Sequence, residues 1–265
     1  MLMNNIKAAV FDIDGTLLPH GEAAPSQKTF AAIDALRKKG IKVIIATGRA
    51  QPSGELALGG MKADYYLYNN GALVLDENRK PIFESRMTPE EMYALVDFCE
   101  DYALPLNFAF SDATYVYEDY DRFRAMYGPY SSVSLLRNGE DQVRHLISMP
   151  FSACAILPAD KIKEFEQKYG YLGLRFVSFH GNNCDIMRVG VNKAASLKQL
   201  LKIIGIEKEN VAAFGDGSND IELLSMSGVS IAMENGTDVL KKSADIIAPP
   251  CDEDGAAQII EKYFL

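Results

Sequence analysis

The sequence predicts an α/β fold, in which a doubly wound parallel-sheet core of Rossmann-like layout is interrupted by an inserted α+β module. The first third of the chain alternates short apolar runs with amphipathic stretches, as β-α-β units do. From about Phe83 to Arg188 this alternation gives way to a mixture of strands and helices, and it resumes afterwards. These observations predict a core formed by residues 1–82 and 189–265, with the module spanning residues 83–188.

The opening segment predicts parallel strands joined by helices. A buried strand is expected over Ala8–Asp12, a helix over Ser26–Lys39 with Ser26 as its cap, and a strand over Ile41–Ala46. Right-handed crossovers would place the two strands side by side. The segment continues with a short helix ending at Leu58, a strand over Tyr65–Tyr68, and a hairpin whose strands flank Asp76–Lys80.

The rest of the chain yields the remaining elements of the module and of the core. In the module we expect a helix over Glu90–Ala103, strands over Leu106–Phe110, Thr114–Tyr117 and Phe151–Leu157, a helix over Asp160–Tyr169, and strands over Leu174–Phe179 and Cys184–Arg188. The aromatic, proline-interrupted middle of the module is assigned no element. In the core we expect a helix over Lys193–Ile204, a strand over Val211–Phe214, a helix from Ser218, a strand over Val229–Ala232 and a final helix.

Composition limits the classes of partner. The 265 residues are 48% hydrophobic and carry a net charge of -9, which argues against nucleic acid or an anionic membrane surface as partner. The four cysteines are dispersed without a C-x-x-C pair, which favours buried reduced thiols. The start MLMNNIK shows no signal sequence, and no apolar run reaches membrane-spanning length. We therefore expect a soluble, cytoplasmic protein, and the sequence predicts no particular oligomeric state.

Two carboxylates follow the first strand in the stretch AAVFDIDGTLL. Side chains two residues apart lie on one face of a strand, so Asp12 and Asp14 would enter the same space where the strand leaves its sheet. Two like charges that close require a metal ion, a shared proton or a cationic substrate. The alternative is a simple turn at Asp14-Gly15 with a solvated Asp12.

Four polar segments favour the functional interpretation: DIDGT, ATGR, NKAASL and GDGSND. Each is expected at the carboxyl end of a core strand or at the start of a core helix, which is where open α/β sheets bind ligands. Asp12 and Asp14 would meet Asp216 and Asp220 there. Such a density of carboxylates suits a hard divalent cation with oxygen ligands, and Mg²⁺ is the simplest choice.

These segments, taken in order, resemble the four motifs of the haloacid dehalogenase (HAD) superfamily of aspartate-nucleophile phosphatases. DIDGT resembles the first motif, Thr47 in IIATGR the second, Lys193 in VNKAASL the third, and GDGSND with Asp216 and Asp220 the fourth. The inserted module occupies the place where the Cof-type group of this superfamily carries a large α/β cap. The resemblance therefore implies a catalytic core and a cap domain.

The resemblance also implies roles for the acidic residues. Asp12 would be the nucleophile that forms an aspartyl-phosphate, and Asp14 the general acid and base. The metal ligands would be Asp12, Asp216 and, through its carbonyl group, Asp14. Asp220 is expected in the same metal group, where it and Asn219 would orient the metal, its waters or the phosphate.

Further residues of the second and third motifs would bind the phosphate. Lys193 would neutralise the phosphoryl group and the nucleophile, while the Thr47 hydroxyl and the Ile13 amide would contact phosphoryl oxygens. Gly48 and Arg49 follow Thr47 and are expected on the substrate side of the site. For Arg49 two interpretations stay open at this point: contact with the substrate phosphate, or pairing with an acidic neighbour.

The function that follows is Mg²⁺-dependent hydrolysis of small phosphorylated metabolites such as sugar phosphates. Two alternatives share the same core: a sugar phosphomutase or phosphotransferase, and a noncatalytic sugar-phosphate sensor. Activation by a bisphosphate would favour the mutase. The presence of Asp12, Asp14, Lys193 and Asp216 weighs against the sensor, since a binding protein needs neither a nucleophile nor an acid.

Overall fold

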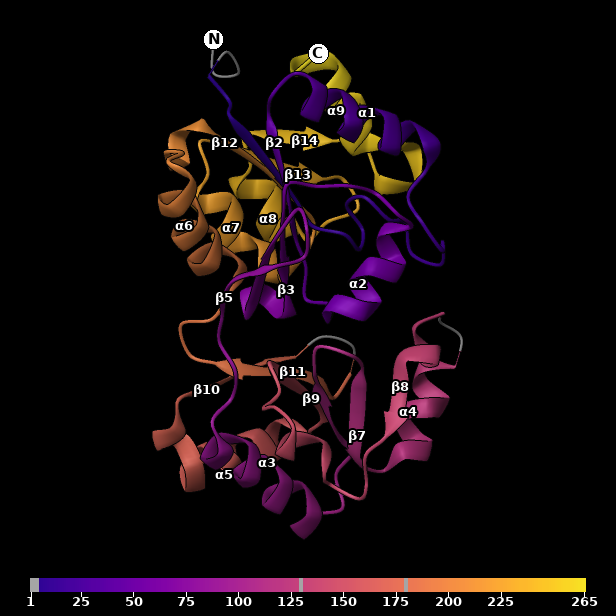
Figure 1. The fold of residues 1–265 in the computed structure, drawn as a ribbon, viewed down its shortest axis with the longest axis vertical. Coiled ribbons are helices and arrows are strands. Elements are labelled where there is room, and N and C mark those ends of the chain that lie inside the picture. Colours follow the sequence, from indigo (N-terminus) through magenta and orange to yellow (C-terminus); the bar gives the residue numbers. More distant parts are fainter. Residues whose placement is uncertain (1–4, 129–130, 179–180) are drawn as a thin grey trace. The chain divides into compact units, whose positions relative to one another are not determined.

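The chain folds into two compact units, each built around its own sheet (Figure 1). The computed structural model describes residues 5–128, 131–178 and 181–265. One unit comprises Met1–Arg49, Gly54–Phe83 and Asn192–Leu265, and the other comprises Ala50–Ser53 and Glu84–Val191. The predicted α/β class is confirmed, with one mostly parallel sheet and one mostly antiparallel sheet.

The sheet of the first unit has the strand order β14-β13-β12-β1-β2-β3-β4-β5 within the described residues. It is parallel from β14 to β3, and β4 runs antiparallel to β3. Its strands are β1 (Ala8–Phe11), β2 (Lys42–Ala46), β3 (Tyr65–Tyr68), β4 (Leu73–Asp76), β5 (Pro81–Glu84), β12 (Val211–Gly215), β13 (Val229–Met233) and β14 (Ile246–Ala248). The helices of this part of the chain are α1 (Gln27–Lys38), α2 (Gln51–Leu58), α6 (Lys193–Ile204), α7 (Ile221–Met226), α8 (Asp238–Ser243) and α9 (Gly255–Tyr263).

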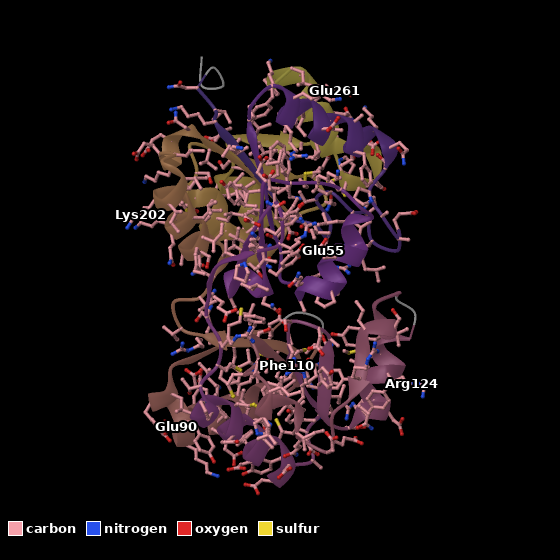
Figure 2. All side chains as sticks on the ribbon, in the orientation of Figure 1. Glu55, Glu90, Phe110, Arg124, Lys202 and Glu261 are labelled. Atoms are coloured by element: carbon pink, nitrogen blue, oxygen red, sulfur yellow. The ribbon has the colours of Figure 1, made fainter. Side chains whose placement is uncertain are left out.

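Helices cover both faces of this sheet, as a doubly wound fold requires. Leucines of α6, α7 and α8 pack against one face, while α1 and α9 lie side by side on the other (Figure 1). Leu197 and Leu200 of α6 are fully buried, and each contributes about 1.5–3 kcal/mol to folding by leaving water. Lys202 of α6 and Glu261 of α9 point away from this core (Figure 2). The amphipathic pattern thus fixes which side of each helix meets the sheet.

The second unit contains a sheet with the order β10-β11-β9-β6-β7-β8. Its pairs are antiparallel except for β7 and β8. The strands are β6 (Leu106–Ala109), β7 (Thr114–Glu118), β8 (Leu136–Asn138), β9 (Ser152–Ile156), β10 (Leu174–Ser178) and β11 (Asn183–Arg188), and the helices are α3 (Pro89–Asp101), α4 (Tyr120–Tyr127) and α5 (Ala159–Tyr169). Residues of α3 and α5 form a core with one face of the sheet, whereas Phe123 of α4 packs with Val116 and Cys154 of the other.

Several elements differ from the sequence-based expectation. The proline-interrupted middle of the module contains α4 and β8, and the end of the chain contains α8 and β14 in addition to the final helix. Helix α8 has six residues and β14 three, too few for a periodic pattern to show. The helix expected from Ser218 begins as a 3-10 turn over Ser218–Asp220 and becomes α-helical at Ile221. Phe179, predicted as a strand end, lies outside the described residues.

Two expectations drawn from composition can be compared with the structure. Cys99, Cys154, Cys184 and Cys251 are buried and form no disulfide, as predicted. None of the helices in the described parts of the chain has the length and apolar character that a bilayer crossing needs.

The strand order creates a switch point between β1 and β12. From β1 the chain proceeds to β2 and β3 on one side of the sheet, and it returns through β12 and β13 on the other side. The crossovers that leave β1 and β12 therefore diverge, and open α/β sheets bind ligands beyond the carboxyl ends of such a pair of strands. Asp12 directly follows β1, and Asp216 directly follows β12.

The capping box of α3 yields a prediction about stability. The Thr88 hydroxyl accepts from the Glu91 amide at 3.2 Å, and the Glu91 carboxylate accepts from the Thr88 amide at 2.7 Å. Thr88→Ala removes one of these bonds and should lower the free energy of unfolding by about 1 kcal/mol in urea titrations. Thr88→Ser keeps the hydroxyl and should stay close to wild type; equal losses in the two variants would contradict this account.

Candidate active site

The four predicted motifs converge at the switch point of the core sheet. Asp12 follows β1, Thr47 follows β2, Asp216 follows β12, and Lys193 begins α6. Asp12, Thr47 and Lys193 are buried, with exposed fractions of 6%, 1% and 0%. Polar side chains are buried in this way only where other polar groups satisfy them, so the site is defined by its internal contacts.

The loop after β1 is shaped by a tight turn at Gly15. The amides of Leu17 and Leu18 both donate to the Ile13 carbonyl, at 2.9 and 2.8 Å. Gly15 has a φ of +73°, and a Cβ added there would lie 2.3 Å from Asp216 Oδ2. Glycine is required both by this backbone conformation and by the close approach of the Asp216 carboxylate. The turn thereby brings the first motif against the fourth.

Lys193 is the buried cation of the site. It is the first residue of α6, whose cap is the Asn192 side chain, which accepts from the Ala195 amide at 2.7 Å. Its Nζ donates to Asp12 Oδ1 and to Asp220 Oδ1, each at 2.7 Å. Burial alone would lower the pKa of Lys193, but the two carboxylates outweigh that effect and hold the pKa above its ordinary value. Lys193 therefore stays charged between two acids.

Asp220 anchors the fourth motif. While Oδ1 accepts from Lys193, Oδ2 accepts from the backbone amides of Asp216 and Gly217, at 3.1 and 3.0 Å. The side chain is completely buried. A carboxylate with contacts on both oxygens is held in one orientation, so Asp220 ties the loop after β12 to Lys193.

Three carboxylates form a cluster beside Lys193. Side-chain oxygens of Asp12, Asp216 and Asp220 lie within 4.8 Å of one another. Burial, with Asp220 as a further cause, raises the pKa of Asp216 to about 7, although the Thr16 hydroxyl donates to it at 3.3 Å. Burial and the neighbouring carboxylates likewise raise the pKa of Asp12, against the opposing effect of Lys193. The carboxylates therefore repel one another, since a single ammonium group balances only one of their charges.

This donor set fits a divalent metal ion. Carboxylate oxygens are the ligands that hard divalent cations prefer, and such a cation would offset the negative charge that Lys193 leaves uncompensated. The turn at Gly15 leaves room for the Asp216 carboxylate, because a Cβ at Gly15 would lie 2.3 Å from Asp216 Oδ2. Asp12 and Asp216 are the side chains that could hold the ion, since both oxygens of Asp220 already have other partners.

The second motif forms the neighbouring loop. The Thr47 hydroxyl accepts from the Arg49 amide at 3.1 Å, so the Thr47 side chain turns back onto its own loop. Gly48 packs closely on Asn70, because a Cβ at Gly48 would lie 3.2 Å from Asn70 Nδ2. Asn219 Nδ2 in turn donates to Asn70 Oδ1 at 3.1 Å. Asn70 thus joins the second motif to the fourth.

Asp14 and Arg49 form an ion pair with two hydrogen bonds. Arg49 Nε lies 2.7 Å from Asp14 Oδ2, and Arg49 Nη2 lies 2.7 Å from Asp14 Oδ1. Of the two interpretations left open for Arg49, the structure shows pairing with an acidic neighbour, while its contact with a substrate stays a prediction. The Asp14 side chain is not a member of the carboxylate cluster found among the described residues.

Asn70 and Asn235 are site residues that the sequence analysis did not identify. Asn235 Nδ2 donates to the Gly15 carbonyl, and its Oδ1 accepts from the Cys251 amide, each at 2.8 Å. Asn70 has a φ of 53° and lies in the short 3-10 turn Asn69–Gly71 that follows β3. Each asparagine precedes a glycine in the sequence, and this turn signature is the one signal that could have drawn attention to them.

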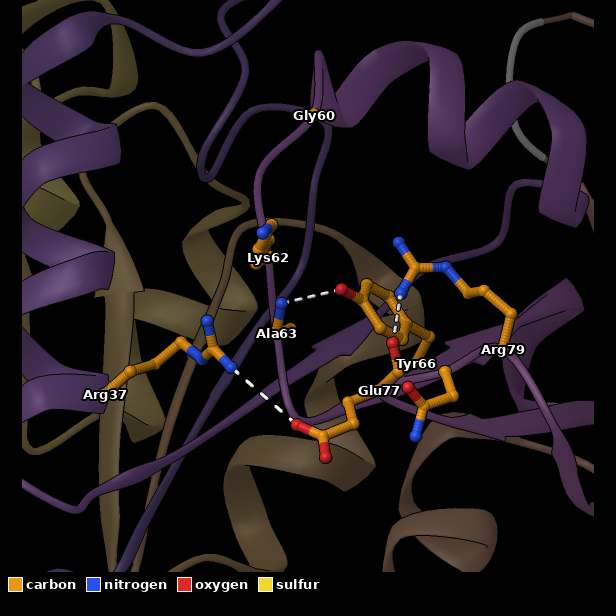
Figure 3. Close-up of a pocket in the computed structure, with 8 residues that line it drawn as sticks. Arg37, Gly60, Lys62, Ala63, Tyr66, Glu77 and Arg79 are labelled. Carbon is orange, nitrogen blue, oxygen red and sulfur yellow. Dashed lines mark hydrogen bonds and ion pairs between the residues drawn. The ribbon is translucent and has the colours of Figure 1, made fainter.

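A separate hollow of about 610 Å³ lies near the amino end of β3 (Figure 3). Its arginines already have partners: Arg37 Nη2 lies 4.0 Å from Glu77 Oε2, and Arg79 pairs with Glu55 and stacks on the Tyr66 ring. The hollow contains none of the predicted site residues. The lining residues are Arg37, Gly60, Lys62, Ala63, Tyr66, Glu77, Asn78 and Arg79.

Comparison with known proteins identifies the family. A family model described as haloacid dehalogenase-like hydrolase matches residues 9–260. The 5-amino-6-(5-phospho-D-ribitylamino)uracil phosphatase YitU of Bacillus subtilis is 28% identical over 262 residues, covering 96% of each chain. A longer relative from Streptococcus pyogenes is 28% identical over 275 residues, and this chain spans 54% of its length.

The solved structures agree on the fold. A structure described as the HAD subclass IIB sugar phosphatase BT4131 superposes with a TM-score of 0.79 at 24% identity, covering 97% of this chain and 98% of that one. The four motifs at the switch point, the carboxylate cluster with its buried lysine, and a family model that spans nearly the whole chain lead to one conclusion: the chain belongs to the haloacid dehalogenase-like hydrolase family.

Proposed function

We propose that this protein is a Mg²⁺-dependent phosphatase that hydrolyses small phosphorylated metabolites through an aspartyl-phosphate on Asp12. The observation that carries the proposal is the position of Asp12: its carboxylate lies at the end of β1, 2.7 Å from the buried Lys193 and within the same cluster as Asp216. A carboxylate flanked by a fixed cation and a divalent-metal site can approach an anionic phosphoryl group without prohibitive repulsion.

The chemistry follows from the roles of two aspartates. An Asp12 oxygen attacks phosphorus, so that an Asp12–phosphorus bond forms while the bond to the ester oxygen breaks. Asp14 donates a proton to the departing oxygen and then removes one from the attacking water. The water oxygen bonds to phosphorus, the Asp12–phosphorus bond breaks, and inorganic phosphate leaves. Because Lys193 contacts Oδ1 of Asp12, we assign the attack to Oδ2.

The other motif residues stabilise charge and orientation. Lys193 neutralises the phosphoryl group, and Thr47, Gly48 and Asn219 line the place where phosphoryl oxygens bind. A bound Mg²⁺ would supply positive charge that offsets the charges of the Asp12 carboxylate and the phosphoryl oxygens. Asp12, Asp216 and the Asp14 carbonyl group would hold it, while Asp220 fixes Lys193 and the loop.

The substrate class is a phosphorylated sugar or sugar-like alcohol. Two relatives support it by their names: one acts on a phosphoribityl compound and the other is called a sugar phosphatase. Residues 83–188 are the cap, whose role is to exclude water and to select the leaving group. The order of strands and the separate core of this second unit support its assignment as an independent module.

The first test measures phosphate release from a panel of sugar and alditol phosphates, with and without Mg²⁺. Asp12→Asn removes the nucleophile and should lower turnover by at least about 10³-fold, because a neutral amide cannot replace the attacking carboxylate. Asp34→Asn is the control: it changes an exposed aspartate of α1, which pairs with Lys38 on the surface, and should leave turnover unchanged. Equal turnover by wild type and Asp12→Asn would refute the mechanism.

A second test follows metal binding by thermal stability, without turnover. Mg²⁺ that binds the folded site should raise the melting temperature of the wild-type protein, corresponding to about 2.7 kcal/mol at a hundredfold excess over Kd. Asp216→Asn removes a ligand and should lose most of this shift. Asp238→Asn, which alters an exposed aspartate at the start of α8, should keep the full shift. A Mg²⁺ response that survives Asp216→Asn would place the metal elsewhere.

A further inference from the structure

The contact between Asp14 and Arg49 has a geometry that restricts what Asp14 can do. Both carboxylate oxygens of Asp14 accept from the guanidinium group, each at 2.7 Å. Parallel contacts of this kind are among the strongest side-chain interactions, and they fix the orientation of the carboxylate as well as its distance. The Asp14 side chain is therefore held in one orientation by Arg49.

Arg49 itself is held by the loop that follows β2. Its amide donates to the Thr47 hydroxyl at 3.1 Å, and its carbonyl accepts from the Asn69 amide at 2.8 Å. These contacts fix the backbone from which the guanidinium group extends. The Arg49 and Asp14 side chains are 29% and 39% exposed, so solvent screens the ion pair in part. The position of Asp14 is thus set by a neighbouring strand and not by its own loop alone.

Asp14 lies beside the carboxylate cluster without joining it. Asp14 lies two residues after Asp12, and the adjacent Gly15 packs directly against the Asp216 carboxylate, so Asp14 is close to both. Even so, the described carboxylates whose oxygens lie within 4.8 Å of one another are those of Asp12, Asp216 and Asp220. A carboxylate two residues from Asp12 would be drawn to a divalent cation in that cluster unless another cation held it.

We propose that Arg49 is a positioning residue, which keeps the Asp14 carboxylate off the metal ion and available to the leaving group. The inference rests on the proposed phosphatase function. The guanidinium group takes one lone pair of each Asp14 oxygen, so a second lone pair on each oxygen stays free to exchange a proton with the ester oxygen or with water. Binding to Mg²⁺ would instead turn the Asp14 carboxylate toward the cluster and away from the leaving oxygen. The guanidinium group supplies the competing charge, and its two-point geometry directs the carboxylate away from the cluster.

The test compares two kinds of ester. An alkyl phosphate, such as the best sugar phosphate of the panel, needs a proton on its leaving oxygen, whereas 4-nitrophenyl phosphate releases a stable phenolate and does not. Arg49→Met should lower kcat for the alkyl ester by roughly tenfold or more relative to the aryl ester. Arg49→Lys keeps the charge but not the two-point contact, and should fall between wild type and Arg49→Met.

Metal binding gives a readout that does not depend on turnover. Titration of MgCl₂ alone into the protein, followed by calorimetry, should show several-fold tighter binding in Arg49→Met, because the released Asp14 carboxylate joins the ligands. The double variant Asp14→Asn/Arg49→Met should return to wild-type affinity. Arg79→Met is the matched control, since it removes the two-point pair of Arg79 with Glu55 and should change neither readout.

The outcomes separate this inference from the function on which it rests. Equal losses for both esters together with unchanged Mg²⁺ affinity in Arg49→Met would overturn the positioning role while leaving the phosphatase intact. A wild-type protein that releases phosphate from no ester would overturn the proposed function, and the calorimetric comparison would then still decide where Arg49 holds Asp14. If Arg49→Met does not fold, Arg49→Lys provides the same two comparisons.

Discussion

The site depends on the buried ammonium group of Lys193. A charge with no exposed surface has lost its hydration, at a cost of several kcal/mol, and it is stable here only because two carboxylates contact it at 2.7 Å. Those contacts join three segments that are distant in sequence: the end of β1, the start of α6 and the loop after β12. Removing the lysine would leave two buried carboxylates without their cation, a change that typically costs about 3–5 kcal/mol.

The same arrangement leaves the site with too little positive charge to balance its carboxylates. This net negative charge connects the fold to the chemistry of the site. One ammonium group faces three clustered carboxylates, with a fourth, that of Asp14, held nearby by Arg49. A fully neutralised cluster would be more stable, but it would not attract a divalent cation. Burial first, and then the neighbouring carboxylates, raise the pKa values of Asp12 and Asp216. Stability and reactivity are therefore opposed at the end of β1.

Much of the fold and most of the site could be predicted from the sequence. The alternation of apolar runs placed β3 and α6 within their observed bounds, and motif order identified Asp12, Lys193, Asp216 and Asp220 as neighbours. These successes depend on patterns that local chain geometry produces. A strand of four residues that is followed by an aspartate, such as β1 with Asp12, is visible in sequence because side-chain periodicity and burial act on adjacent residues.

The features that could not be predicted from the sequence depended on three-dimensional proximity, or on elements too short to show a hydrophobic period. Whether Arg49 pairs with Asp14 is decided by the distance between two loops on adjacent strands, β1 and β2, which no local pattern encodes. Asn70 and Asn235 resembled ordinary turn residues, because their side-chain partners come from other loops. Helix α8 and strand β14 are packed into place by the sheet beside them rather than by their own periodicity.

Trapping the covalent intermediate tests the central claim most directly. The protein would be mixed with a phosphorylated substrate and Mg²⁺, quenched in acid within milliseconds, digested and analysed by mass spectrometry. The account predicts that the peptide containing Asp12 gains the mass of one phosphoryl group, and that fragmentation places this group on Asp12. Phosphate release without any such adduct, or an adduct on a different residue, would contradict it.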